Sequence, residues 1–195
     1  EGEYLFFTDS DDTLFPDTLA TLYQKAKVSG ADLSVCGFTY LVEQTKECVD
    51  NLPEKAFCGG GKEYLEERFL SDFRREFFNP PWNKLIRRKL LEENGVRFVP
   101  GLRQGEDLYF CLMLLTVAPR LLILPDRLYH YRRERPGSAS CGRDPRLGDF
   151  RMDLMGMESL ARFWGERGLL DSPAAFGLVD YCMELMRRHF IMKEG

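Results

Sequence analysis

The sequence lacks a long apolar run, an excess of basic residues and any closely spaced pair of cysteines. Its longest apolar stretch, residues 110–118, is about half of the roughly 20 residues that a membrane-spanning helix needs. A net charge of −4 gives no general attraction to nucleic acid. The six cysteines form no CxxC pair, which argues against a zinc site. The apolar neighbours of several of them favour reduced, buried thiols in a cytosolic protein.

What is present is ordinary for a globular chain. The 195 residues are 44% hydrophobic and 30% charged, enough for one domain or a domain with an appendage. Apolar periodicity and the positions of Gly and Pro predict an alternation of strands and helices. Strands are expected at 3–8, 32–42, 82–86, 120–124 and 127–132, and helices at 16–28, 62–75, 88–93, 106–117, 145–167 and 173–192, with a hairpin or excursion at 43–55.

An acidic run, Asp9-Ser10-Asp11-Asp12, directly follows the apolar residues 4–7. Three carboxylates within four residues repel one another unless a cation compensates them, and hard divalent cations such as Mg²⁺ or Mn²⁺ suit oxygen ligands. If strand geometry persists, Asp9 and Asp11 face the same side. The alternative is a simple turn, in which Asp12 caps the helix expected from Pro16.

A second acidic pair, Glu106-Asp107, opens the helix expected at 106–117. The plainer interpretation is that the pair only stabilises the positive end of the helix dipole. The functional interpretation is a general base at the mouth of a cleft, with its pKa lowered by the dipole so that it stays ionised.

Two further groups are candidates for binding. Trp82-Asn83-Lys84 combines a flat ring with hydrogen-bond donors that suit a sugar, although a core Trp and a solvated Lys explain it equally well. The run at 130–138 combines arginines, including Arg132, with a Gly/Ser loop containing Ser138, a composition that suits phosphate. His130 in this run is either a metal ligand or a packed strand residue.

Taken in order, these pieces resemble the inverting GT-A family-2 glycosyltransferases of bacteria. The segments that carry the resemblance are 3–12, 31–38, 82–88, 105–108 and 129–132 with 136–138, so that it covers about residues 3–140. The resemblance implies an α/β fold, a GT-A mixed sheet flanked by helices. It divides the chain into a partial catalytic domain at 1–143 and a helical C-terminal extension at 144–195.

The resemblance also implies roles for individual residues. The Asp9-Ser10-Asp11 segment looks like the DxD motif, with Asp9 near the donor, Asp11 on the metal and Asp12 as a helper. Asp107 would be the catalytic base with Glu106 beside it. Trp82, Asn83 and Lys84 would border the acceptor. Arg132 and Ser138 would close over the diphosphate, and His130 is a second candidate metal ligand.

The implied reaction transfers a sugar from a nucleotide-sugar donor to a glycan or lipid-linked acceptor with inversion, assisted by Mg²⁺ or Mn²⁺. Its expected setting is surface polysaccharide synthesis in the cytoplasm, at the inner face of the membrane, and no nucleic acid is involved. Two alternatives remain: a scaffold module with vestigial acidic motifs, and a metal-dependent nucleotidyl- or phosphotransferase. The sequence has no phosphate-binding loop of the P-loop type, which the second would favour.

One departure from the family pattern concerns the start of the chain. Family members open with a strand-rich nucleotide-binding segment, and these residues contain nothing that resembles it. We therefore expect the bare chain to bind a nucleotide sugar poorly, and its open sheet edge to favour pairing with a second copy.

Overall fold

The computed structural model describes residues 2–42, 45–69, 72, 77–103, 105–133 and 150–191. Strands and helices alternate through most of the chain, as the sequence predicts. In chain order the elements are β1 (Tyr4–Phe6), β2 (Thr13–Leu14), α1 (Thr18–Ser29), β3 (Leu33–Val42), β4 (Cys48–Asn51), β5 (Phe57–Gly59), α2 (Gly61–Glu67), β6 (Lys84–Arg87), α4 (Arg88–Asn94), α5 (Glu106–Val117), β7 (Leu121–Arg133), α6 (Phe150–Gly165) and α7 (Pro173–Ile191).

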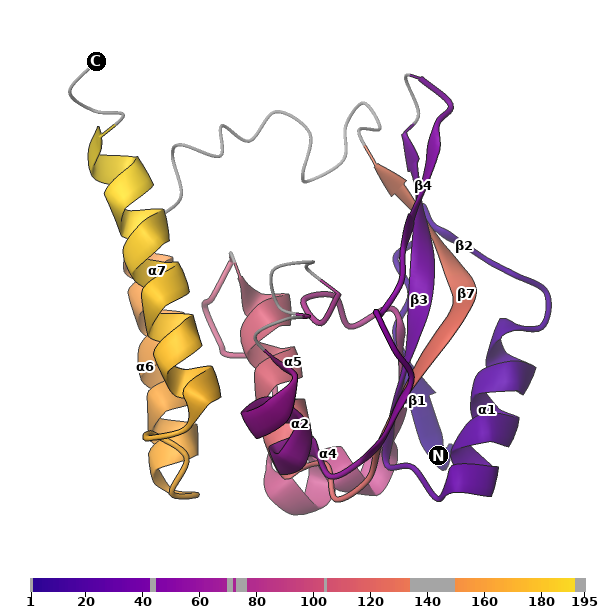
Figure 1. The fold of residues 1–195 in the computed structure, drawn as a ribbon, viewed down its shortest axis with the longest axis horizontal. Helices are drawn as coiled ribbons and strands as arrows, with labels where there is room; N and C mark the ends of the chain where they lie inside the picture. The colour runs from indigo at the N-terminus through magenta and orange to yellow at the C-terminus, as the bar shows by residue number, and fades with distance from the viewer. Residues whose placement is uncertain are drawn as a thin grey trace.

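The strands form one mixed sheet in the order β1-β6-β3-β7-β2, with β4 paired to β3 and β5 paired to β7. The central pair, β3 and β7, is parallel, and the other pairs are antiparallel. Helix α1 covers one face of the sheet, while α2, α4 and α5 lie on the other, with α6 and α7 outside them (Figure 1). The predicted α/β fold with a mixed sheet flanked by helices is confirmed.

Strand β7 is one continuous element, whereas two strands were expected on either side of Pro125-Asp126. Its register against β3 shifts where Cys36 pairs with Leu124 and Gly37 pairs with Arg127. A bulge absorbs the proline, which has no N–H to donate. Gly37 suits this place because an added Cβ would lie 3.1 Å from the backbone oxygen of Asp126.

The short strands β2 and β5 were also not expected. Both pair with β7, at His130 and Tyr129 for β2 and at 121–123 for β5. Segments of two or three residues are too short to show an alternating pattern. Helix α1 begins at Thr18, two residues after the expected start at Pro16, with Asp17 in the N-cap position.

Helix α5 lies at the centre of the main hydrophobic core, and residues 109–115 are all buried. Side chains of α6 and α7, among them Leu160, Trp164 and Leu178, belong to the same core. The Trp164 indole donates a 2.7 Å hydrogen bond to Thr116 of α5. The C-terminal helices therefore share their packing with the segment at 106–117.

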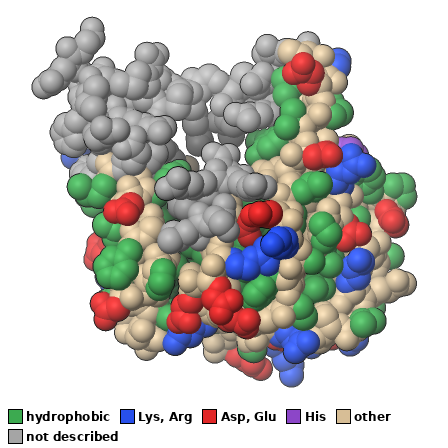
Figure 2. Space-filling view, in the orientation of Figure 1, with side chains coloured by type: hydrophobic (Ala, Val, Ile, Leu, Met, Phe, Trp, Pro, Cys, Tyr) green, Lys and Arg blue, Asp and Glu red, His purple; other side chains and the backbone are tan. Residues whose placement is uncertain are grey.

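Acidic and basic side chains are interspersed over the face of the molecule shown in Figure 2. Within the described ranges, no helix has the length and apolar character to cross a membrane. Cys36 and Cys111, which have apolar neighbours, are buried free thiols as expected, whereas Cys48 and Cys58 are exposed free thiols.

Candidate active site

The acidic run forms a turn. Strand β1 ends at Phe6, and the backbone N–H of Asp12 donates to the carbonyl of Asp9 at 3.3 Å. The alternation expected for a continued strand does not apply here, because the chain reverses direction. The idea that Asp12 caps the first helix is also wrong, since Asp17 takes the N-cap position of α1.

Asp12 anchors this turn to β7. Its carboxylate accepts a 2.6 Å hydrogen bond from the Tyr129 hydroxyl and a 2.9 Å bond from the backbone N–H of Arg132. The Tyr129 hydroxyl in turn accepts a bond from the N–H of Asp9 at 3.2 Å. Trp82 stacks on the Tyr129 ring, with centroids 4.3 Å apart. Asp12 and Tyr129 together hold the position of the turn and leave Asp9 and Asp11 at its outer side.

The carboxylates of the turn are electrostatically strained. Burial raises the pKa of Asp9, and the neighbouring charge of Asp11 raises it further. Burial also raises the pKa of Asp12, against the lowering effect of its hydrogen bonds from Arg132 and Tyr129. A cation or a set of hydrogen-bond donors at Asp9 and Asp11 would relieve this repulsion.

Glu106 and Asp107 form the first turn of α5, as the sequence predicts, after Gly105 in the left-handed conformation with φ 74°. Burial, and then the charges of Glu106 and Asp9, raise the pKa of Asp107 to about 6. The expectation that the helix dipole lowers this pKa is wrong, because burial and two like charges outweigh it. A carboxylate with this pKa is mostly ionised at neutral pH and still basic enough to accept a proton.

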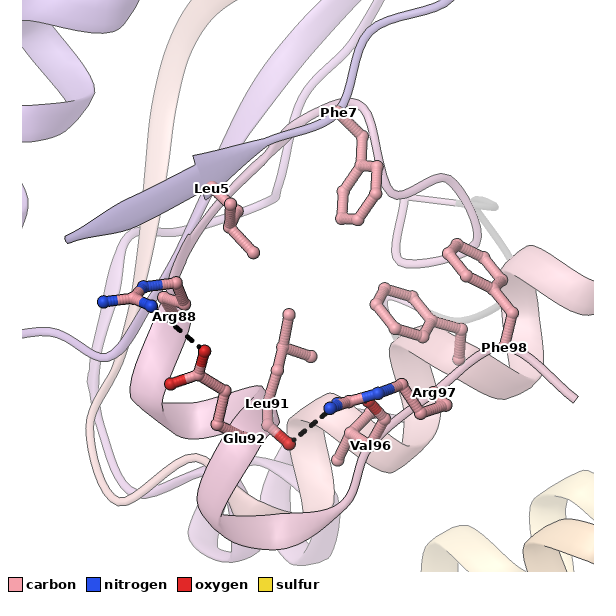
Figure 3. A pocket seen from close by; sticks show the side chains of 9 residues that line it. Leu5, Phe7, Arg88, Leu91, Glu92, Val96, Arg97 and Phe98 are labelled. Atoms are coloured by element: carbon pink, nitrogen blue, oxygen red, sulfur yellow. Dashed lines mark hydrogen bonds and ion pairs between the residues drawn. The ribbon is translucent and has the colours of Figure 1, made fainter. Parts of the chain in front are cut away.

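An aromatic cluster connects the acidic turn to α5. The ring of Phe7, two residues before Asp9, packs edge-on against Phe98 and Phe110 at 5.9 and 5.8 Å. Phe110 lies one helical turn after Asp107, and it stacks on Phe98 at 4.1 Å. These rings line an apolar pocket of about 310 Å³ (Figure 3). The cluster places the turn and Asp107 on the same side of the molecule.

Trp82, Asn83 and Lys84 are all buried, with exposed fractions of 6%, 0% and 0%. The Asn83 amide nitrogen donates to the carbonyls of Cys36 and Phe77. The Lys84 ammonium donates to the Pro80 carbonyl at 2.6 Å and to Asn83 Oδ1 at 2.7 Å. Their contact with an acceptor stays a prediction, and their burial favours a role beneath the site.

The structure describes only part of the predicted phosphate-binding run at residues 130–138. His130 packs its ring on Phe15, with centroids 4.0 Å apart, which suits the packed interpretation. Arg132 contributes its backbone N–H to Asp12, beside the turn. Ser138 lies outside the described residues. A ligand role for His130 and a diphosphate contact for Arg132 stay predictions.

In the part of the chain that the structure describes, no three His, Cys, Asp or Glu side chains could together hold a metal ion. Mg²⁺ usually keeps several waters and takes one or two carboxylates together with substrate phosphates. Asp9 and Asp11, whose charges act on each other, could supply these one or two carboxylates. Asp12 is already engaged by Tyr129 and Arg132.

Sequence reasoning missed Tyr129 as a member of the site. Its position in the alternating strand gave no sign of its hydroxyl contacts with Thr8, Asp9 and Asp12. The weak signal was the pair of aromatic residues, Tyr129 and Tyr131, two positions apart on one strand face.

The mixed sheet, with an acidic turn after its edge strand β1 and a half-buried carboxylate at a helix start, matches the GT-A fold of nucleotide-sugar glycosyltransferases. Crystal structures of Staphylococcus aureus TarS residues 1–349 share this fold. The complex of TarS with UDP-GlcNAc has a TM-score of 0.63 and 21% identity, over 97% of this chain and 49% of that chain. Residues 1–95 match the model of glycosyl transferase family 2, in agreement with the resemblance seen in the sequence.

Relatives of known name are also glycosyltransferases. Glycosyltransferase GlyG of Streptococcus pneumoniae is 30% identical over 71% of this chain and 46% of its own length. The cholesterol galactosyltransferase of Borreliella burgdorferi is 24% identical over 98% of this chain and 51% of its own length. The poly(ribitol-phosphate) beta-N-acetylglucosaminyltransferase TarS of S. aureus is 28% identical over 70% of this chain. The chain spans between 22% and 51% of the length of these three relatives.

Proposed function

We propose that this chain carries the acidic turn and the catalytic base of a glycosyltransferase that moves a sugar from a nucleotide-sugar donor to an acceptor hydroxyl with inversion. The observation that carries the proposal is the packing of the segment before the acidic turn against helix α5. Phe7 meets Phe110 with ring centroids 5.8 Å apart, and the charge of Asp9 contributes to the raised pKa of Asp107. A donor held at the turn would therefore lie within reach of a base.

In this reaction Asp107 accepts the proton of the acceptor hydroxyl as the hydroxyl oxygen bonds to the anomeric carbon. The bond from that carbon to the donor phosphate oxygen breaks, and its electron pair leaves with the nucleoside diphosphate. Attack from the side opposite the leaving group inverts the configuration. Glu106 lies beside Asp107 and keeps its proton affinity high through like-charge repulsion.

Asp9 and Asp11 are the residues that would hold Mg²⁺ or Mn²⁺ with the diphosphate, and such an ion supplies a Lewis acid for the departing group. Asp12 and Tyr129 keep both carboxylates in place. The name of TarS, whose structure includes a complex with UDP-GlcNAc, supports a UDP-sugar donor and a cell-surface polymer as product. We place the reaction on the cytoplasmic side of the membrane, where a nucleotide-sugar donor and a lipid-linked acceptor can meet.

The test compares Asp107→Asn with Asp11→Ala in the intact natural protein. UDP-N-acetylglucosamine is the first donor probe, other nucleotide sugars follow, and release of the nucleoside diphosphate is measured. We expect Asp107→Asn to reduce turnover by about 10²–10⁴-fold while donor binding is kept. We expect Asp11→Ala to reduce both turnover and metal-dependent donor binding.

The matched control is Asp126→Asn, which removes an exposed carboxylate paired with Lys25 on the surface. It should change neither turnover nor metal-dependent donor binding. Full turnover in both site variants would overturn the proposal. A metal-dependent transfer of phosphate or of a nucleotide, with no sugar transferred, would favour the nucleotidyl- or phosphotransferase alternative.

A further inference from the structure

An aromatic row, formed by Phe38, Tyr40, Trp82, Tyr129 and Tyr131, follows the two central strands. In the register of β3 against β7, Phe38 pairs with Tyr129. Two residues further on, Tyr40 pairs with Tyr131, so all four side chains lie on the same face of the sheet. Trp82 stacks on Tyr129 and on Tyr131, with ring centroids 4.3 and 5.1 Å apart and interplanar angles of 14° and 10°. One indole therefore connects both tyrosines of β7.

The aromatic row leads from the core to the surface. Phe38, Tyr129 and Trp82 are 1%, 0% and 6% exposed, whereas Tyr40 and Tyr131 are half-buried. The rings of Tyr40 and Tyr131 meet edge to face, with centroids 5.8 Å apart and an interplanar angle of 76°. The buried rings fix the row in the core, and the two outer tyrosines present part of their surface to solvent.

The aromatic row is joined to the acidic turn. The Tyr129 hydroxyl donates to the Asp12 carboxylate at 2.6 Å and accepts from the backbone N–H of Asp9 at 3.2 Å. The backbone N–H of Arg132, the residue after Tyr131, donates to the same carboxylate at 2.9 Å. The strand that carries Tyr131 is therefore hydrogen-bonded to the turn on both sides of this residue.

The same turn is also joined to helix α5. Phe7, two residues before Asp9, packs edge-on against Phe110 of α5 with centroids 5.8 Å apart. Asp107 lies in the first turn of that helix. The acidic turn thus connects the aromatic row to the helix that begins with the proposed base, and a molecule bound at Tyr131 would lie next to the proposed reaction site.

The chemistry of the aromatic row suits a neutral ring that carries hydroxyl groups. The row contains no Asp, Glu, Lys, Arg or His side chain, and the Asn51 amide donates a 3.5 Å hydrogen bond to the Tyr40 hydroxyl at its outer end. Alternation along β7 places the side chain of Arg132, which would suit a phosphate, on the opposite face from Tyr131. The C–H bonds on one face of a pyranose can pack on the electron-rich face of an aromatic ring, while its hydroxyl groups bond to tyrosine hydroxyls.

We propose that Tyr131, supported by Trp82 and Tyr40, is the platform on which a neutral pyranose ring of the acceptor stacks. This inference rests on the proposed function for the word "acceptor", whereas binding of a neutral sugar to the aromatic row does not depend on it. The acceptor contact expected of Trp82 passes to the half-buried ring that Trp82 supports. The inference also names the acceptor class, a glycan with a pyranose unit rather than an open-chain polyol phosphate.

The experiment measures the binding of chitotriose, cellotriose and maltotriose to the intact natural protein in the absence of a donor. Saturation-transfer NMR reports the bound sugar, and the indole N–H resonance of Trp82, assigned with Trp82→Phe, reports the place of binding. We expect saturable binding of at least one trisaccharide, with a shift of the Trp82 resonance that follows the sugar concentration. Ribitol 5-phosphate and uridine are the comparison probes and should leave this resonance unchanged.

Variants of Tyr131 separate the ring from the hydroxyl. Tyr131→Ala should weaken trisaccharide binding by about tenfold, because it removes the stacking surface. Tyr131→Phe keeps the ring and should bind within about twofold of the wild type. Tyr23→Ala is the matched control, since it removes an exposed tyrosine from α1, which covers the opposite face of the sheet. It should bind the trisaccharide like the wild type. If Tyr131→Ala does not fold, Tyr131→Leu, which keeps apolar bulk without a ring, is measured in its place.

The outcomes distinguish this inference from the proposed function. Failure of all three trisaccharides to bind the folded wild type overturns the inference, as does equal binding by the variant without the Tyr131 ring. An equal loss of UDP-N-acetylglucosamine binding in that variant, or a Trp82 shift caused by uridine, would assign the aromatic row to the donor and overturn it as well. A protein that binds a trisaccharide through Tyr131 but transfers no sugar overturns the proposed function instead, and leaves the sugar platform standing.

Discussion

The two halves of the site are built in opposite ways. The acidic turn at residues 9–12 lies near the surface, and β7 holds it through Tyr129 and the backbone of Arg132. Asn83 and Lys84 form a layer in the interior. They donate to the carbonyls of Cys36, Phe77 and Pro80, and Lys84 also donates to Asn83. A site at the surface can receive a ligand, whereas a buried polar layer needs hydrogen-bond partners within the protein. The first region should therefore respond to substitution mainly in function and the second mainly in stability.

The largest expected effect is on the buried layer. Asn83→Ala removes the side-chain donor to two carbonyls and one of the acceptors of the buried Lys84 ammonium. We expect a loss of about 3 kcal/mol in the free energy of unfolding, measured by urea denaturation. Asn51→Ala is the control, since the half-buried Asn51 donates a long 3.5 Å bond to Tyr40. Equal stability of the two variants would contradict the distinction between the regions.

The next largest effect is expected from removing the Tyr129 hydroxyl, which anchors the acidic turn to the sheet. Tyr129→Phe keeps the ring on Trp82 but removes the hydroxyl that Asp12 and Asp9 use. We expect a loss of about 1–2 kcal/mol in the free energy of unfolding, with a weaker affinity for the donor. Tyr131→Phe also keeps a ring that stacks on Trp82 and serves as the comparison. A Tyr129→Phe variant with wild-type donor affinity would show that the turn does not depend on its anchor.

The pH dependence of turnover reports on Asp107. Its pKa of about 6 means that the base becomes protonated as the pH falls through 6, so the rate should drop by about tenfold for each unit below that value. As the pH falls through 6, the stability of the fold should rise while turnover drops. Because the folded-state pKa lies above the ordinary value of 3.8, ionised Asp107 destabilises the fold above pH 6, and protonation relieves this.

Asp107→Asn checks the second half of this prediction. The neutral amide removes the buried charge, so its melting temperature at pH 7 should exceed that of the wild type, and the difference should shrink towards pH 4. A variant that is less stable than the wild type at pH 7 would mean that Asp107 has a compensating partner.

The smallest effect concerns the outer side of the turn. Asp11→Ala should change the free energy of unfolding by less than about 0.5 kcal/mol, since Asp11 is incompletely buried and adds to the charge repulsion on Asp9. The same variant is expected to lose metal-dependent donor binding. Thermal unfolding with and without Mg²⁺ separates these two effects. A large loss of stability without Mg²⁺ would place Asp11 among the structural residues, with Asp12.

Much of the fold was predictable because the signals are local. The run of apolar residues at 33–42, and the acidic start of 106–117, correspond closely to β3 and α5. The short strands β2 and β5 were not predictable, because they exist through pairing with β7, more than 60 residues away in the sequence. Likewise the interruption at Pro125-Asp126 seemed to end a strand, and only the neighbouring strand β3 shows that a bulge carries β7 past it.

The sequence was sufficient to locate both acidic groups, since clustered carboxylates after a strand and at a helix start are local patterns. It could not reveal that Asp12 is a structural anchor. Its partner Tyr129 lies 117 residues away in the sequence and reaches Asp12 only in the folded chain. The raised pKa of Asp107 and the burial of Lys84 likewise arise only in the folded chain. Desolvation and Coulomb interaction depend on distances in space, and those distances exist only in the folded chain.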